Sequence, residues 1–282
     1  MQMQHKVKTI WWLQEAKVID HFINEKDFIP TLSSAQNIVG VSDYSLGMIR
    51  KYNTNYRKIY NACYDFYDPA QHVKEIGARL NFTIVGSIES RKGHDVLFKA
   101  LGLLEDEILE RLAVRVVGRV LDPNFDAMIR QQIPSHASVS FTGEITNAEA
   151  VKLVAGADVI VCPSRDDPFP VVLVEGFCMA KTCLVSDATG FAELIENGEN
   201  GFVFASEDAE ELADIMRNIV LRSSEIEPIG QKAREVYLRE LSIPVLEQRL
   251  LPYMEALPDP GLKQTRKGKV TYKKSGTTFQ KI

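Results

Sequence analysis

Short apolar runs alternate with amphipathic stretches through most of the 282-residue chain. This alternation predicts a parallel sheet with helices on both faces. The run at residues 82–87 is almost continuously apolar, which is typical of a strand that is buried on both faces. We expect further strands at residues 113–117, 139–141, 159–162, 182–186 and 202–204. We expect helices at residues 94–104, 125–132, 148–155, 171–179, 191–196, 209–221, 231–237 and 243–254.

The first 75 residues contain pieces of a second α/β layer. Apolar runs predict strands at 7–13, 37–41 and 58–62, and a helix is expected over 44–51. Three strands with at most two helices do not fill a doubly wound domain, so this segment resembles the back half of one. The expected fold is therefore α/β. A Rossmann-like parallel sheet (76–257) is preceded by a partial second Rossmann-like domain (1–75) and followed by a tail (258–282).

Charge and composition narrow the classes of partner. The net charge of −5 gives no general attraction to nucleic acid, and no apolar run approaches the ~20 residues of a membrane helix. We expect a cytoplasmic protein. From Lys263 onward the tail has seven basic and no acidic residues. We expect it to be disordered, and two interpretations stay open: a solvated segment, or peripheral contact with anionic lipid at the inner face of a membrane.

Cysteine and histidine give no sign of a metal site. The four cysteines have apolar neighbours and form no CxxC pair, which predicts buried, reduced thiols: Cys63, Cys162, Cys178 and Cys183. No pair of histidines has the spacing of metal ligands. We expect His94 to begin a helix rather than to bind a ligand.

The first candidate for chemistry is the loop Gly86–Gly93, which leaves a strand and enters a helix. Loops of this kind matter because open α/β sheets bind ligands outside the carboxyl ends of their strands. The loop matches neither the dinucleotide fingerprint nor the P-loop. Arg91 and Lys92 offer a planar fork and a point charge to phosphate oxygens. Two solvated cations in a surface turn are the other interpretation.

The second candidate is the segment Pro163–Glu175, in which a loop is followed by a helix that starts near Pro170. The start of such a helix can bind an anion. Glu175 stands on an otherwise apolar helix, where its carboxylate can accept hydrogen bonds from a vicinal diol such as a ribose. The other interpretation of Glu175 is a partly exposed residue at a helix start, favoured by the helix dipole. The other interpretation of Asp167 is a residue of a turn or a helix cap. A third segment, Ser186–Gly201, has turn glycines that are usually structural.

Together these segments resemble the C-terminal domain of a GT-B glycosyltransferase of family 4, the retaining class that uses nucleotide-sugar donors. The resemblance extends over residues 80–222 and rests on five motifs in order. These are the glycine and "rKG" loop at 86–93, the "v.F.G" strand at 139–143, "adv.v.PS" at 157–164, the E-x7-E motif at 167–175 and "dg.nG.l" at 197–202.

The resemblance implies catalytic roles for three residues and no metal cofactor. Arg91 and Lys92 would neutralise the donor diphosphate and stabilise the charge that grows on the leaving nucleotide. Asp167 takes the first acidic position of the motif and would contact the donor sugar. It is an aspartate where the family has glutamate, so its carboxylate is one methylene shorter.

The resemblance also implies a set of donor-binding residues. Gly86 would face the diphosphate. The backbone amides at Phe169, Pro170 and Val171 would hold the diphosphate or the sugar. Glu175 would bind the ribose hydroxyls. The base would lie near residues 118–119 and 143–144. Pro170 departs from the family, which often has glycine there.

The N-terminal segment resembles the end of the acceptor-side domain of the same family, at residues 10–15, 39–42 and 59–62. Gln14 stands where the family has histidine, and an amide cannot do a histidine's acid–base work. The first half of that domain has no counterpart here. Three explanations stay open: the tail of a larger enzyme, a subunit whose partner chain completes the N-terminal half, or a degenerate homologue.

The expected function is transfer of a sugar from a UDP- or GDP-type donor to a saccharide or lipid-linked acceptor, with retention. The alternative is a non-catalytic nucleotide-sugar-binding or scaffold homologue. A nicotinamide-dependent oxidoreductase is disfavoured, because no GxGxxG sequence follows any predicted strand.

Overall fold

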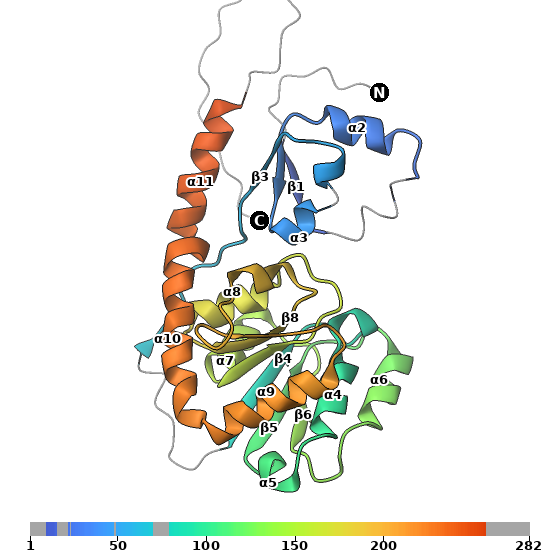
Figure 1. Cartoon of the computed structure of the whole chain (residues 1–282), viewed down its shortest axis with the longest axis vertical. Helices are drawn as coiled ribbons and strands as arrows, with labels where there is room; N and C mark the ends of the chain where they lie inside the picture. Colours follow the sequence, from blue (N-terminus) through green and yellow to red (C-terminus); the bar gives the residue numbers. More distant parts are fainter. Residues whose placement is uncertain (1–9, 16–21, 23, 48, 70–78, 258–282) are drawn as a thin grey trace, which may run out of the picture.

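The computed structural model describes residues 10–15, 22, 24–47, 49–69 and 79–257, and these contain two parallel sheets (Figure 1). The smaller sheet has the order β1-β2-β3, with strands β1 (Trp11–Leu13), β2 (Ile38–Gly40) and β3 (Tyr56–Lys58). The larger sheet has six strands: β4 (Leu80–Val85), β5 (Leu112–Val117), β6 (Val139–Phe141), β7 (Val159–Cys162), β8 (Thr182–Ser186) and β9 (Phe202–Phe204). The predicted α/β class is confirmed. The tail from residue 258, with its predicted disorder, lies outside the described residues.

The larger sheet has the strand order β6-β5-β4-β7-β8-β9, and all its pairings are parallel. The chain therefore builds outward from β4 in one direction through β6, and then returns to place β7 on the other side of β4. This is the doubly wound order, in which ligands bind outside the carboxyl ends of the strands where the order reverses. In this sheet the reversal lies between β4 and β7, so the loops at residues 86–93 and 163–170 border it.

Helices cover both faces of the larger sheet, as predicted. One hydrophobic cluster includes residues of α4 (His94–Leu101), α5 (Asp106–Leu109), α6 (Pro123–Arg130) and α9 (Ala209–Leu221). The other includes residues of α7 (Asn147–Ala155), α8 (Val171–Cys178) and α10 (Ile226–Val236). Side chains alternate along β7, with Val159 and Val161 in the first cluster and Ile160 and Cys162 in the second. The four cysteines are buried and free, which confirms that prediction.

The third strand differs from its prediction at 58–62, because β3 lies at Tyr56–Lys58. Only Ile59 extends the ladder, through a hydrogen bond from its N–H to the carbonyl of Gly40. The Tyr60 ring then stacks on Phe169 of the larger part, with 5.1 Å between the ring centroids. The apolar pattern therefore reflected packing between the two parts, since residues after 59 leave the sheet.

Other differences concern helices. The predicted helix at 191–196 is a 3₁₀ turn, η4 (Gly190–Leu194). The helix predicted from 231 begins at Ile226 and continues into a π-helical turn, η6 (Tyr237–Leu241). The helix predicted at 44–51 is divided between α3 (Asp43–Leu46) and the 3₁₀ turn η1 (Ile49–Lys51). Two short helices have no counterpart in the prediction, α2 (Phe28–Ser34) and α5.

The last helix connects the two parts of the molecule. In Figure 1, α11 (Ile243–Ala256) runs from beside α10 toward β3. The Arg57 guanidinium of β3 lies over the Tyr253 ring of α11, 5.1 Å from its centroid. In the turn Tyr237–Leu241, which precedes α11, the Tyr237 hydroxyl donates a 3.0 Å hydrogen bond to the carbonyl of Cys63 in the segment between the sheets. Residues 237–256 therefore contact both the smaller sheet and the segment that leads to the larger one.

Gly230 tests the packing of α10. A Cβ at this position would lie 2.0 Å from the carbonyl oxygen of Ala180, so Gly230→Ala forces the backbone to shift. We expect it to lower the free energy of unfolding by about 1–3 kcal/mol. Gly156→Ala is the control, because its nearest neighbour would be 3.6 Å away, and we expect a change within about 0.5 kcal/mol. Equal denaturant midpoints for the two variants would contradict this close contact.

His94 is the first residue of α4, which confirms its predicted place at a helix start, and it is fully buried. Neither ring nitrogen has a hydrogen-bond partner among the described residues. Burial lowers the pKa of His94 from 6.5 to about 4. Between these pH values the folded state binds fewer protons than the unfolded state. Stability is therefore lost as the pH falls through this window.

We expect the free energy of unfolding to show this effect as a difference between wild type and His94→Gln. From pH 7.5 to 4.5 the wild type should lose about 2 kcal/mol more than the variant, because only the wild type has to keep an imidazole neutral. Urea titrations at both pH values measure the difference. Parallel pH profiles for the two proteins would show that His94 can be protonated in the folded state.

Candidate functional site

The two loops that border the strand reversal contact each other directly. The N–H of Arg165 donates to the carbonyl of Arg91 at 2.8 Å, and Nη1 of Arg91 donates to the carbonyl of Asp166 at 3.1 Å. Gly93 has a φ of +69°, and a Cβ there would lie 1.9 Å from the carbonyl oxygen of Pro163. Glycine is therefore required for this approach. The first two segments predicted from the sequence form one site.

The three residues predicted to be catalytic form a cluster at this site. Nζ of Lys92 lies 2.6 Å from Oδ2 of Asp167, and both side chains are largely buried. Nη1 of Arg91 lies 4.0 Å from the same oxygen, and the Arg91 side chain is 42% exposed. Arg91 also pairs with Glu89, which sequence reasoning missed, at 3.2 Å. An anion that enters the site would therefore compete with two carboxylates for these cations.

A second arginine anchors the 163–170 loop to the start of α4. The Arg165 guanidinium binds both carboxylate oxygens of Asp95 at 2.8 Å, and its Nε binds Glu207 at 2.8 Å. Burial by itself raises the pKa of Asp95, but hydrogen bonds and charge from Arg165 outweigh it and the pKa is lowered. Sequence reasoning missed this pair. Its signal in the sequence was an arginine in a loop directly after a predicted strand, but its partner Asp95 lies 70 positions away.

The start of α8 borders the same site. Phe169 is buried, with its ring 5.1 Å from Tyr60 and 5.0 Å from Phe191, so its side chain anchors the loop rather than facing a ligand. Pro170 precedes the helix and Val171 begins it, half exposed. The first N–H groups of an α-helix have no partner inside the helix. The predicted binding of the nucleotide-sugar donor by residues 169–171 therefore depends on backbone groups rather than on side chains.

Glu175 lies one turn beyond Val171 on the same face of α8, because residues four apart are neighbours on a helix. Its side chain is partly buried, and burial raises its pKa above the ordinary value. Among the described residues no hydrogen bond or ion pair involves it. Glu175, the residue predicted to bind the ribose, is thus a partly desolvated carboxylate whose oxygens have no hydrogen-bond donor among the described residues.

Glycines follow the carboxyl ends of β4, β5 and β6. A Cβ on Gly118 would lie 2.0 Å from the carbonyl oxygen of Gly86, so these two strand ends pack closely. A Cβ on Gly86 would lie 3.4 Å from Cδ of Lys92, so the stem of Lys92 passes over this glycine. A Cβ on Gly143 would meet nothing within 4 Å. The space predicted for a base, beside residues 118–119 and 143–144, is consistent with this geometry.

Residues that follow β2 of the smaller sheet contact the 163–170 loop. The Ser42 hydroxyl donates to the carbonyl of Pro168 at 2.7 Å, and the Tyr44 hydroxyl donates to Oδ1 of Asp166 at 2.7 Å. Gln14, which replaces the family's histidine, exchanges two amide hydrogen bonds with Asn61, at 3.0 and 3.1 Å. Sequence reasoning missed Ser42 and Tyr44 as site residues, because their partners lie more than a hundred residues away.

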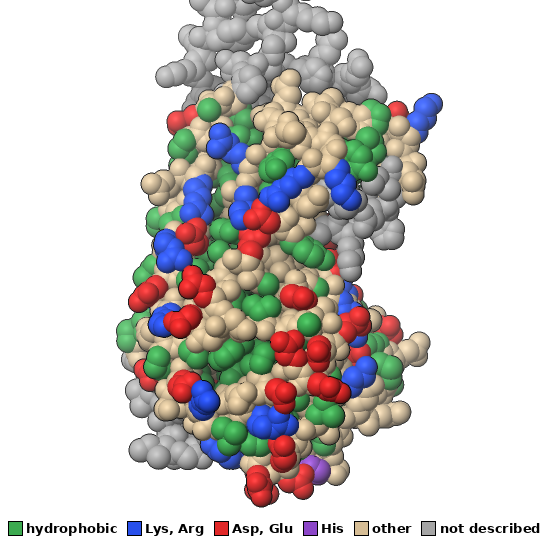
Figure 2. All heavy atoms as spheres, in the orientation of Figure 1, with side chains coloured by type: hydrophobic (Ala, Val, Ile, Leu, Met, Phe, Trp, Pro, Cys, Tyr) green, Lys and Arg blue, Asp and Glu red, His purple; other side chains and the backbone are tan. Residues whose placement is uncertain are grey.

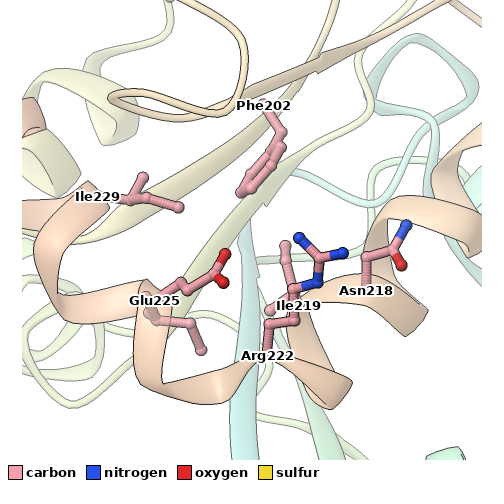
Figure 3. A pocket seen from close by; sticks show the side chains of 7 residues that line it. Phe202, Asn218, Ile219, Arg222, Glu225 and Ile229 are labelled. Carbon is pink, nitrogen blue, oxygen red and sulfur yellow. The ribbon is translucent and has the colours of Figure 1, made fainter.

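Other features of the described residues do not point to chemistry. No group of three or more side chains that could ligate a metal ion occurs there, and no helix there combines the length and apolar character needed to cross a bilayer. A pocket of about 200 Å³ lies beside the edge strand β9, between Phe202, Ile219, Arg222, Glu225 and Ile229 (Figure 3). On the face in Figure 2, basic and acidic side chains are interspersed.

Comparisons with solved structures support this architecture. HepE from Anabaena in complex with UDP superposes with a TM-score of 0.75 at 19% identity, covering 88% of this chain and 72% of HepE. Its complex with UDP-glucose gives a TM-score of 0.74 at 18% identity, with the same coverage. Sucrose-phosphate synthase from Thermosynechococcus elongatus gives 0.74 at 17% identity, covering 90% of this chain and 69% of the synthase. At these identities the likeness shows the GT-B-like fold.

Sequence comparisons add the family. Phosphatidyl-myo-inositol mannosyltransferase from Mycobacterium leprae is 30% identical over 141 residues, 48% of this chain and 36% of the mannosyltransferase. Granule-bound starch synthase 1 from Pisum sativum is 26% identical over 133 residues, 45% of this chain and 22% of the synthase. The chain thus matches about a fifth to a third of these relatives. The model of the family "Glycosyl transferases group 1" matches residues 72–236, more than half of the chain, and the chain belongs to this family, GT4.

Proposed function

We propose that this chain contributes the donor-binding and catalytic side of a retaining glycosyltransferase. The enzyme transfers a sugar from a UDP- or GDP-type donor to a saccharide or lipid-linked acceptor. The observation that carries the proposal is the Arg91–Lys92–Asp167 cluster at the strand reversal of a group 1 family chain. Complexes of the structurally similar HepE with UDP and UDP-glucose support a uridine donor.

The chemistry we propose is electrostatic and uses no metal cofactor. The donor diphosphate takes the place of Asp167 beside Lys92 and of Glu89 beside Arg91, and the two cations stabilise the charge on the leaving nucleotide. The bond between the anomeric carbon and the diphosphate oxygen breaks, and the acceptor oxygen bonds to the same face of the sugar. The acceptor proton passes to the leaving diphosphate. Asp167, once displaced, is free to contact the donor sugar.

The remaining roles extend the same proposal. Gly86 and the backbone of residues 169–171 face the diphosphate and the sugar, and Glu175 accepts hydrogen bonds from the ribose hydroxyls. We propose a donor domain at 76–257 and a partial acceptor domain at 1–75, which a partner chain or further domain completes. We also propose a cytoplasmic location, with peripheral membrane contact through the basic tail.

One observation favours a second candidate function, a non-catalytic nucleotide-sugar-binding or scaffold protein. Gln14 is hydrogen-bonded to Asn61 at a position where the family has histidine, and neither amide can transfer a proton near neutral pH. The two functions differ in outcome. An enzyme releases sugar from its donor, whereas a scaffold binds nucleotide without turnover.

The first prediction concerns Arg91 and Lys92. The double variant Arg91→Ala plus Lys92→Ala should lower donor turnover by about a hundredfold or more, because it removes the charge that stabilises the leaving diphosphate. Turnover is measured as UDP or GDP released from UDP-glucose or GDP-mannose, by the chain alone and with a co-expressed partner. The matched control, Lys152→Ala plus Arg222→Ala, removes the same charge away from the site. Unchanged turnover in the first variant would show that these cations are not catalytic.

The second prediction concerns Glu175. Titration calorimetry should show that Glu175→Ala binds UDP about tenfold more weakly, because a charged acceptor of two hydroxyls is lost. The wild type should bind 2′-deoxy-UDP more weakly than UDP, and the variant should bind the two equally. Glu210→Ala, at an exposed glutamate in the first turn of α9, is the control. If the variant still distinguishes the two nucleotides, Glu175 does not bind the ribose.

A further inference from the structure

The loop that carries Asp166, Asp167 and Pro168 is held from the side of the smaller sheet. Ser42, at the start of α3, is completely buried and donates its hydroxyl hydrogen to the carbonyl of Pro168 at 2.7 Å. Its oxygen also accepts the N–H of Ser45 at 3.0 Å, which caps α3. A hydroxyl can perform both tasks at once, whereas an ionised aspartate, another good cap, has no hydrogen to donate.

A third segment closes on the same point. The N–H of Gly190 donates to the carbonyl of Asp167 at 2.9 Å. A Cβ at Gly190 would lie 1.9 Å from the carbonyl oxygen of Pro168 and 2.3 Å from Oγ of Ser42. The contact is braced nearby, since Glu193 accepts from the N–H of Asp43 at 2.8 Å and from Nζ of Lys58 at 2.9 Å. Residues 167–168 are therefore packed closely between Ser42 and η4.

A chain of hydrogen bonds leads from this contact to the cluster. The Tyr44 hydroxyl donates to the carboxylate of Asp166 at 2.7 Å. The carbonyl of the same residue accepts Nη1 of Arg91 at 3.1 Å. Asp166 is 8% exposed, and both bonds are partly buried. Tyr44 is thus hydrogen-bonded to the residue whose carbonyl accepts Arg91.

We propose that Tyr44 and Ser42 are positioning residues for the diphosphate site. They hold residues 166–168 in place, so that Arg91 is oriented toward the crevice and Asp167 lies beside Lys92. The nucleotide affinity of the larger part then depends on the smaller sheet. This inference rests on the proposed function, because it assigns the positioning to the same site.

Tyr44→Phe in the full 282-residue chain removes the hydroxyl and keeps the ring. Without nucleotide, the peptide 163–170 should exchange its amide hydrogens at least about twofold faster, because the loop loses one of its anchors. UDP affinity should fall about fivefold, the effect of one hydrogen bond to a charged group that acts indirectly. Tyr64→Phe, at a tyrosine that is 72% exposed, is the matched control and should change neither quantity.

A double-mutant cycle separates positioning from a general loss of structure. If Tyr44 acts through Arg91, Tyr44→Phe should weaken UDP binding in the wild-type background and have no further effect in Arg91→Ala. Asp166→Asn, which keeps the volume and the backbone carbonyl, should behave like Tyr44→Phe.

The outcomes are distinct. Unchanged exchange in the 163–170 peptide, or equal loss of affinity in both backgrounds, would overturn the positioning role. If the wild type binds none of UDP, GDP and ADP, the proposed function fails instead. The exchange measurement alone then decides whether Tyr44 holds the loop.

Discussion

Strand β4 pairs with β5 on one side and with β7 on the other, and this reversal of direction is the constraint on which the site depends. The helices that follow β4 and β7 lie on opposite faces of the sheet, so the loops that lead to them meet at the carboxyl ends of the two strands. The close approach of Gly93 to Pro163 then brings Lys92 to Asp167. Each cation and carboxylate of the cluster depends on this strand order.

The cluster is balanced in charge before any ligand arrives. Lys92 lies beside Asp167 and Arg91 beside Glu89, in a chain whose net charge is −5. In the proposed function, the donor diphosphate displaces both carboxylates, because its several charged oxygens can pair with the two cations at once. The smaller sheet adds rigidity through Ser42 and Tyr44. The arrangement is therefore preorganised by contacts from three separate segments of the chain.

Much of the fold was predictable from the sequence because local patterns carry it. The nearly continuous apolar runs of β4, β7 and β8 identified buried parallel strands, and Gly86 and Pro170 marked where they lead into helices. The pattern failed at residues 59–62, because the Tyr60 ring packs against Phe169 and does not belong to a strand. It also failed at η4, where an α-helix was predicted. The structure has a 3₁₀ turn there, whose first residue donates a backbone hydrogen bond to the carbonyl of Asp167.

By itself, the amino-acid sequence determined the α/β class and the parallel arrangement, because these follow from local patterns of residue type and spacing. Its resemblance to family 4 glycosyltransferases selected Arg91, Lys92 and Asp167 as candidate site residues. Only the tertiary structure decided that Asp167 pairs with Lys92, that Arg165 binds Asp95, and that Tyr44 reaches Asp166. The physical reason is that each of these contacts joins residues at least 70 positions apart, so the strand order and the packing of two sheets, rather than any local pattern, bring them together.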